Sequence, residues 1–106
     1  MAKYLLQASY TTDGVKGLLK EGGTSRRDAV KKAYRSMGAK VESFYFGFGE
    51  TDVYVIADVP DNATMAALAL NVSATGLASV RTTALLTPEE IDKAAKKTPS
   101  YRPPGQ

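Results

Sequence analysis

Hydrophobic and polar residues alternate along four stretches of the chain, which is the pattern of β-strands with one buried face. Val, Ile, Phe, Tyr and Thr, the residues that suit a pleated surface, are frequent in these stretches. The predicted strands are residues 4–10, 40–48, 52–59 and 80–86. Only residues 49–51 separate the second strand from the third. Such a short connection predicts that these two strands pair antiparallel, as a hairpin.

Apolar residues at spacings of three and four predict a helix between the first two strands. Ser25, with Asp28 three positions later, is typical of a helix start. The predicted helix runs from there to about Met37, and Gly38 ends it. A shorter helical turn is expected before it, over residues 12–20.

Two further helices are predicted in the second half of the chain. Asp61 or Asn62 is expected to cap a helix that runs to about Thr75. The segment from Thr87 to Glu90 has a proline at the first helical position and the residues of a capping box, so it predicts a terminal helix.

The resulting order, β-α-β-β-α-β with an extra C-terminal helix, predicts an α+β fold of the ferredoxin-like type. Right-handed crossovers place both main helices on the same face of a four-stranded antiparallel sheet. A length of 106 residues fits one domain, which we assign to residues 1–97. The proline-rich residues 98–106 are expected to form a flexible tail.

The two faces of the predicted sheet differ in polarity. One face is apolar enough to lie under the helices; it carries Tyr4, Leu6, Ala8, Phe44, Phe46, Val53, Val55, Ala57, Val80, Thr82 and Ala84. The other carries Leu5, Gln7, Ser9, Ser43, Tyr45, Asp52, Tyr54, Ile56, Arg81, Thr83 and Leu85. Because this mixed face is too apolar for free contact with solvent, we expect the sheet of a second copy to cover it in a homo-oligomer, most simply a dimeric α/β barrel.

The chain contains no cysteine and no histidine, which restricts its chemistry. Disulfides, thiolate nucleophiles and the usual zinc, copper and haem sites are excluded, so we expect neither a metal nor a cofactor. Acid–base chemistry near neutral pH would require Asp, Glu, Tyr or Lys with a shifted pKa.

Charge and hydropathy exclude other classes of partner. The net charge is only +3, and the cationic residues from Arg26 to Lys40 are interpreted as the solvated face of a helix, so nucleic-acid binding is not expected. No apolar run approaches the ~20 residues of a membrane span. The start of the chain has no signal-peptide pattern, and the expected location is the cytoplasm.

Five residues are candidates for a site. Asp52 begins an apolar strand, where burial could raise its pKa and make it a catalytic base; alternatively its carboxylate bonds backbone amides of the turn. Gln7, Tyr45, Tyr54 and Arg81 share the mixed face and could bind a small anionic or aromatic compound if the strands align them. The alternative for these four is a contact between subunits.

Three motifs around the hairpin carry a resemblance to a known family: Phe-Tyr-Phe at 44–46, Gly-Glu-Thr-Asp at 49–52 and Val-Tyr-Val-Ile at 53–56. With them the chain resembles the GYD domain family over roughly residues 3–92. Gly49 and Asp52 match the family signature, whereas Thr51 stands where the family has tyrosine. The resemblance implies a ferredoxin-like fold and dimeric α/β-barrel assembly, with a function that is largely unassigned.

Two kinds of function follow from these observations. The first is a non-catalytic homo-oligomeric module, structural or ligand-binding, with any small organic ligand between the sheet and the helices. The alternative is a cofactor-free enzyme of the dimeric α/β-barrel kind, isomerase or monooxygenase-like, with Asp52 or a tyrosine as base. The alternative rests on fold analogy alone.

Overall fold

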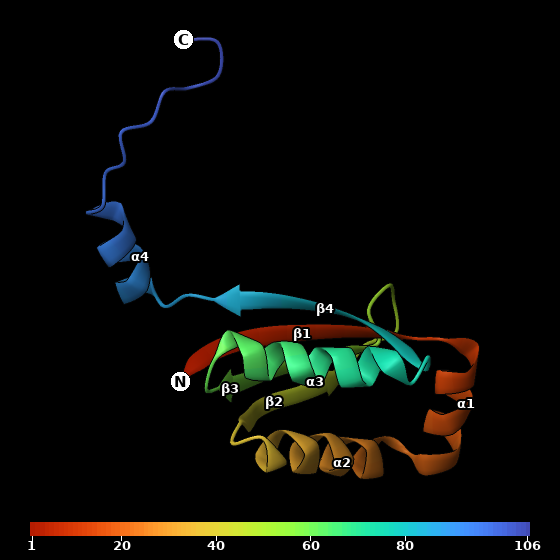
Figure 1. The fold of residues 1–106 in the computed structure, drawn as a ribbon. Coiled ribbons are helices and arrows are strands. Elements are labelled where there is room, and N and C mark those ends of the chain that lie inside the picture. Colours follow the sequence, from red (N-terminus) through yellow and green to blue (C-terminus); the bar gives the residue numbers. More distant parts are fainter.

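A computed structural model describes all 106 residues as an α+β domain with one antiparallel sheet in the strand order β2-β3-β1-β4 (Figure 1). The elements are β1 (Ala2–Tyr10), α1 (Thr12–Glu21), α2 (Gly23–Ser36), β2 (Lys40–Phe46), β3 (Val53–Val59), α3 (Asn62–Ala74), β4 (Ala78–Leu85) and α4 (Pro88–Ala95). Helices α2 and α3 lie on one face of the sheet, and the opposite face carries no helix. The predicted ferredoxin-like fold is confirmed; below, the inner face means the one under α2 and α3, and the outer face means the other.

The starts of α3 and α4 have the predicted caps. Asp61 accepts a hydrogen bond from the backbone N–H of Thr64 at 2.8 Å, and this bond to its charged form lowers the pKa of Asp61. Thr87 and Glu90 form a reciprocal capping box around Pro88. Both helix starts can therefore be located from the sequence because local side chains satisfy their free amides.

The predicted start of α2 is wrong. The helix begins at Gly23, and Ser25 lies in its first turn, where its hydroxyl donates to the carboxylate of Glu21 at 3.2 Å. Gly22 adopts a φ of 87°, a backbone conformation that favours glycine. This single residue turns the chain between α1 and α2, so no separate capping segment is needed.

The hairpin also departs from the prediction, because β2 and β3 are joined by six residues, 47–52, instead of three. Earlier in β2, the pairing with β3 shifts between Val41 and Ser43, which leaves Glu42 as an extra residue in a β-bulge. As a result Val41 and Phe44, three positions apart, both pack against the core on the inner face.

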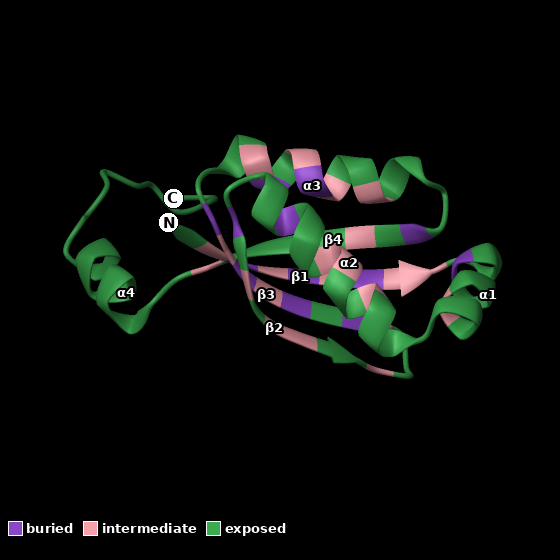
Figure 2. Ribbon diagram, turned by 90° about the horizontal axis from the view of Figure 1, so that it is seen from below, coloured by how far each residue is buried: buried purple, intermediate pink, exposed green.

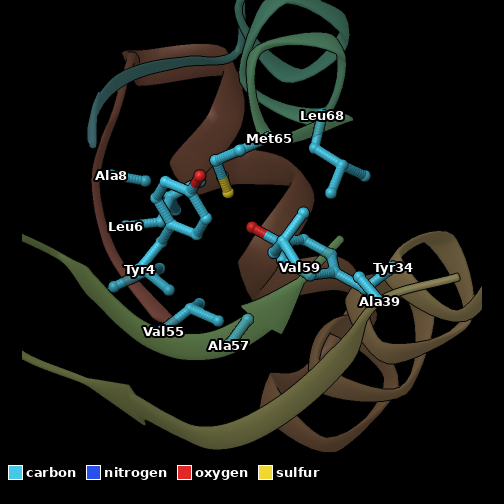
Figure 3. Packing of buried hydrophobic residues seen from close by; sticks show 11 residues of the cluster. Tyr4, Leu6, Ala8, Tyr34, Ala39, Val55, Ala57, Val59, Met65 and Leu68 are labelled. Atoms are coloured by element: carbon cyan, nitrogen blue, oxygen red, sulfur yellow. The ribbon is translucent and has the colours of Figure 1, made fainter. Parts of the chain in front are cut away.

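The core lies between the inner face and the two helices. Figure 3 shows Met65 and Leu68 of α3 meeting side chains from β1 and β3. The buried residues of the core are Tyr4, Leu6, Ala8, Tyr34, Ala39, Val53, Val55, Ala57, Val59, Met65 and Leu68. The predicted inner face is thus confirmed for β1 and β3.

The prediction for the inner face of β4 is wrong in part. Ala78 is buried and Val80 is partly buried, but Thr82 and Ala84 are exposed. Figure 2 shows this change along β4, from buried at its start to exposed toward its end. The reason is that β4 forms an edge of the sheet, and α4 projects away from the domain instead of folding back over the strand (Figure 1).

Residues 96–106, after α4, contain no helix or strand and extend away from the sheet. The expectation of a flexible tail concerns their motion and stays a prediction. None of the four helices is long and apolar enough to cross a membrane.

Candidate functional site

Four of the five candidate residues lie side by side in one row across the outer face. Tyr45 pairs with Tyr54, Tyr54 with Gln7, and Gln7 with Arg81, so the row crosses β2, β3, β1 and β4 in that order. Tyr45 is 70% exposed and Tyr54 is 39% exposed. The structure therefore brings these four residues together; that they bind a ligand stays a prediction.

The β2–β3 loop rises on the outer side of the sheet (Figure 1), and its residue Thr51 contacts part of this row. Thr51 is 5% exposed, and its hydroxyl oxygen accepts hydrogen bonds from Arg81 Nη2 at 2.9 Å and from Gln7 Nε2 at 3.5 Å. Ser9 donates its hydroxyl to the carbonyl of Glu50 at 2.8 Å, which holds the same loop. The polar half of the row thus contacts the chain's own loop, while the two tyrosines are left uncovered.

Asp52 joins the end of this loop to β1. Its carboxylate accepts a hydrogen bond from the backbone N–H of Tyr10 at 2.8 Å, and its own N–H donates to the carbonyl of Ala8 at 2.9 Å. Its carbonyl accepts from the N–H of Gly47 at 2.8 Å, which closes the loop. This geometry supports the interpretation of Asp52 as a turn-stabilising residue.

Asp52→Asn and Asp52→Ala separate the two interpretations of this residue. Because an amide oxygen still accepts the bond from Tyr10, we expect Asp52→Asn to change the free energy of unfolding by less than about 1 kcal/mol. Asp52→Ala leaves a partly buried N–H without its acceptor and should lower that free energy by about 1–2 kcal/mol. Urea unfolding measures both values, and an alanine variant as stable as the wild type would exclude the structural role.

A separate site lies on the inner face, where α2, α3 and the sheet enclose a partly open cavity of about 280 Å³. Of its 17 lining residues, 14 are hydrophobic, so the cavity is predominantly apolar. Leu6 and Val55 contribute from the sheet, Val30 from α2, and Leu68 and Val72 from α3. None of the five candidates from the sequence lines this cavity.

Tyr34 places an unpartnered polar atom in this apolar environment. The residue is 3% exposed, and its hydroxyl is buried without a hydrogen-bond partner. Burial raises the pKa of Tyr34 to about 12, because the phenolate is poorly solvated there. The hydroxyl itself is enclosed by protein atoms, so Tyr34 contributes its ring to the lining, and its unpaired hydroxyl is an unfavourable feature of the interior behind it.

Arg26 lines the same cavity and corrects the prediction for the cationic face of α2, because it does not belong wholly to the solvated face of that helix. Its side chain is 36% exposed, but its Nε is buried and has no partner. Nη1 lies 3.7 Å from the carboxylate of Glu21. The signal was present in the sequence, since Arg26, Val30 and Ala33 follow the i, i+4, i+7 spacing of one helical face.

The cavity also receives the ring of Tyr10, from the end of β1. Burial raises the pKa of Tyr10, and the nearby positive charge of Arg26 opposes that rise. On α3, Asn71 donates its amide to the carbonyl of Ala67 at 2.7 Å and Thr75 donates its hydroxyl to the carbonyl of Val72 at 2.7 Å. Among the residues that line the cavity, Arg26 is the one with a charged side chain, and none has a carboxylate.

Fold and sites together define a small ferredoxin-like domain with an open outer sheet face and a cavity beneath its helices. The model of the GYD domain family matches residues 4–95 of the 106. The chain belongs to the GYD domain family, which confirms the resemblance inferred from the hairpin motifs. Comparisons with curated proteins and with solved structures gave no match.

Proposed function

We propose that the protein is a non-catalytic homo-oligomeric module that binds a small organic ligand in the cavity between α2, α3 and the sheet. The observation that carries this proposal is the cavity itself, which has a volume of about 280 Å³ and a lining of 14 hydrophobic residues together with Arg26, Asn71 and Thr75. Small-molecule sites combine apolar walls with a few polar groups that orient the ligand, and this cavity has both. The alternative of an enzyme with Asp52 as base has no comparable support, since Asp52 bonds a backbone amide and lies outside the cavity.

The ligand-binding part is tested with octan-1-ol, a neutral apolar probe, followed by NMR of the backbone amides. We expect shifts at Leu6, Val30 and Leu68, which line the cavity. The variant Ala29→Leu places a bulkier side chain in the lining and should reduce these shifts, whereas Ala63→Leu on α3, outside the lining, should leave them unchanged. Wild-type protein without shifts at these amides would contradict the proposal.

The assembly part rests on the outer face. Tyr45 and Tyr54 lie opposite each other on neighbouring strands, and Phe48 in the adjacent loop is fully exposed. Large aromatic residues that stay exposed on one side of a sheet are typical of protein contacts. The occupant that we propose is the same face of a second copy, in the manner of a dimeric α/β barrel, because a two-fold contact buries the outer faces of both chains.

Light scattering should give twice the chain mass of 11.3 kDa at micromolar concentration. The double variant Tyr45→Lys, Tyr54→Lys is expected to be monomeric, because a two-fold contact brings the added charges of both copies together. Leu19→Lys serves as the control, since Leu19 is 81% exposed on α1, away from the sheet. A monomeric wild type, or a double variant that still dimerises as the wild type does, would contradict this assembly.

A further inference from the structure

We infer that the cavity selects small organic anions, namely a carboxylate joined to an apolar body, with the carboxylate bound by Arg26. This inference rests on the proposed function, since it specifies the ligand of the same cavity. It goes further by assigning Arg26 as the residue that determines specificity and by giving the chemical class of the ligand.

The first argument is electrostatic. Arg26 is the charged residue among those that line the cavity, and the other polar groups of the lining are phenols, an amide and a hydroxyl. A cation at the border of an apolar site is poorly screened, so it favours an anionic ligand over a neutral one of the same shape. A guanidinium also matches the planar geometry of a carboxylate.

The second argument is the state of the donors on Arg26. Its Nε is buried and unpartnered, although a guanidinium normally has each buried donor satisfied. The carboxylate of Glu21 lies 3.7 Å from Nη1, a distance longer than a hydrogen bond, and it also accepts from the hydroxyl of Ser25 at 3.2 Å. Glu21 therefore makes no hydrogen bond to the guanidinium, and a ligand can reach the group through the exposed part of this side chain, although Nε itself is enclosed by protein atoms.

The third argument concerns size and shape. Arg26 and Tyr34 are eight positions apart on α2, which separates their backbones by about 12 Å. An engineered cavity of ~150 Å³ accepts benzene, so one of about 280 Å³ accepts a ligand of roughly ten non-hydrogen atoms. An extended medium-chain acid fits both the length of about 12 Å and the size of roughly ten non-hydrogen atoms. Its carboxylate would lie at Arg26 and its chain would run along α2.

The experiment compares octanoate with octan-1-ol, which has the same chain without the charge, by isothermal titration calorimetry near neutral pH. We expect octanoate to bind one site per chain and at least about tenfold more tightly than octan-1-ol. Arg26→Gln should remove this preference, which is measured as the ratio of the octanoate and octan-1-ol affinities of the same variant. Arg26→Lys should retain part of the preference, because it keeps the charge but loses the bidentate geometry.

Arg27→Gln is the matched control, because Arg27 is adjacent in sequence, is 45% exposed and contacts Asp28 outside the cavity. It should bind octanoate as the wild type does. The assignment of Arg26 would be overturned if the wild type bound octanoate and octan-1-ol with equal affinity, or if Arg26→Gln and Arg27→Gln changed the octanoate affinity equally. In either case the proposed apolar site would remain intact. If neither probe binds, the proposed function fails together with this inference.

Discussion

Gly14→Ala is expected to lower the free energy of unfolding by about 3 kcal/mol or more, although glycine within a helix is normally unfavourable. A Cβ atom at this position would lie 2.0 Å from the carbonyl oxygen of Leu77 and 3.0 Å from the ring of Tyr10. The Leu77 carbonyl cannot move freely, because it accepts from the N–H of Thr11 at 2.9 Å and lies 3.2 Å from its hydroxyl. The added methyl group must therefore displace α1 from the end of β1 or break these bonds.

Gly17→Ala is the matched control in the same helix. A Cβ atom there would have no neighbour within 4 Å, so only the helix preference of alanine operates. We expect the free energy of unfolding to rise by about 0.5–1 kcal/mol. Urea unfolding of both variants gives the comparison, and equal effects of the two substitutions would show that α1 is not held against Leu77 as described.

Between about pH 10 and about pH 12, Tyr34 is expected to remove about 2 kcal/mol from the free energy of unfolding. Burial raises its pKa to about 12 in the folded state, whereas an unfolded chain releases the proton near the ordinary tyrosine pKa of about 10. The folded state thus binds more protons in this interval, so stability declines as pH rises. Below about pH 9 the contribution is nearly constant, because Tyr34 is neutral in both states.

Tyr34→Phe isolates this contribution from the titration of lysines, which occurs in the same range. The variant should lose less stability than the wild type between about pH 9 and about pH 12. It should also be at least as stable as the wild type at neutral pH, since the missing hydroxyl has no partner to lose. Tyr101→Phe, at a 69% exposed position in the tail, is the matched control for the loss of a tyrosine hydroxyl. A Tyr34→Phe profile identical to that of the wild type would contradict the burial of an unpaired phenol.

Much of the fold is predictable because local chemistry determines it. The alternation along β1 and β3, the cap at Asp61 and the capping box at Thr87 each act within a few residues, and each prediction is confirmed. The start of α2 was not predictable in this way, because Gly22 turns the chain through its backbone conformation and leaves no side-chain pattern. The exposure of Thr82 was missed because it depends on the direction that α4 takes.

The candidate sites likewise have one part that the local sequence determines and one part that only tertiary packing determines. Strand alternation places Tyr45, Tyr54, Gln7 and Arg81 on one face, and the registers then align them in a row. The cavity was predicted only as a place between sheet and helices. Its lining depends on how far α2 and α3 stand apart, and periodicity within each helix carries no information on that separation. The helical spacing places Arg26 on the same face as Val30 and Ala33, but only the packing shows that Arg26 and Tyr34 line a cavity.

The bulge at Glu42 makes the two edges of the sheet unequal. On β2 it interrupts the ladder, and the charges of Lys40 and Glu42 flank the irregular backbone, two features that hinder the addition of a further strand. On β4 the pairing with β1 continues without a break from Ala78 to Leu85, and the strand carries one charged residue. Unwanted strand pairing between copies, and hence aggregation at high concentration, is therefore favoured along β4, and a lysine introduced at the exposed Thr82 would protect that edge.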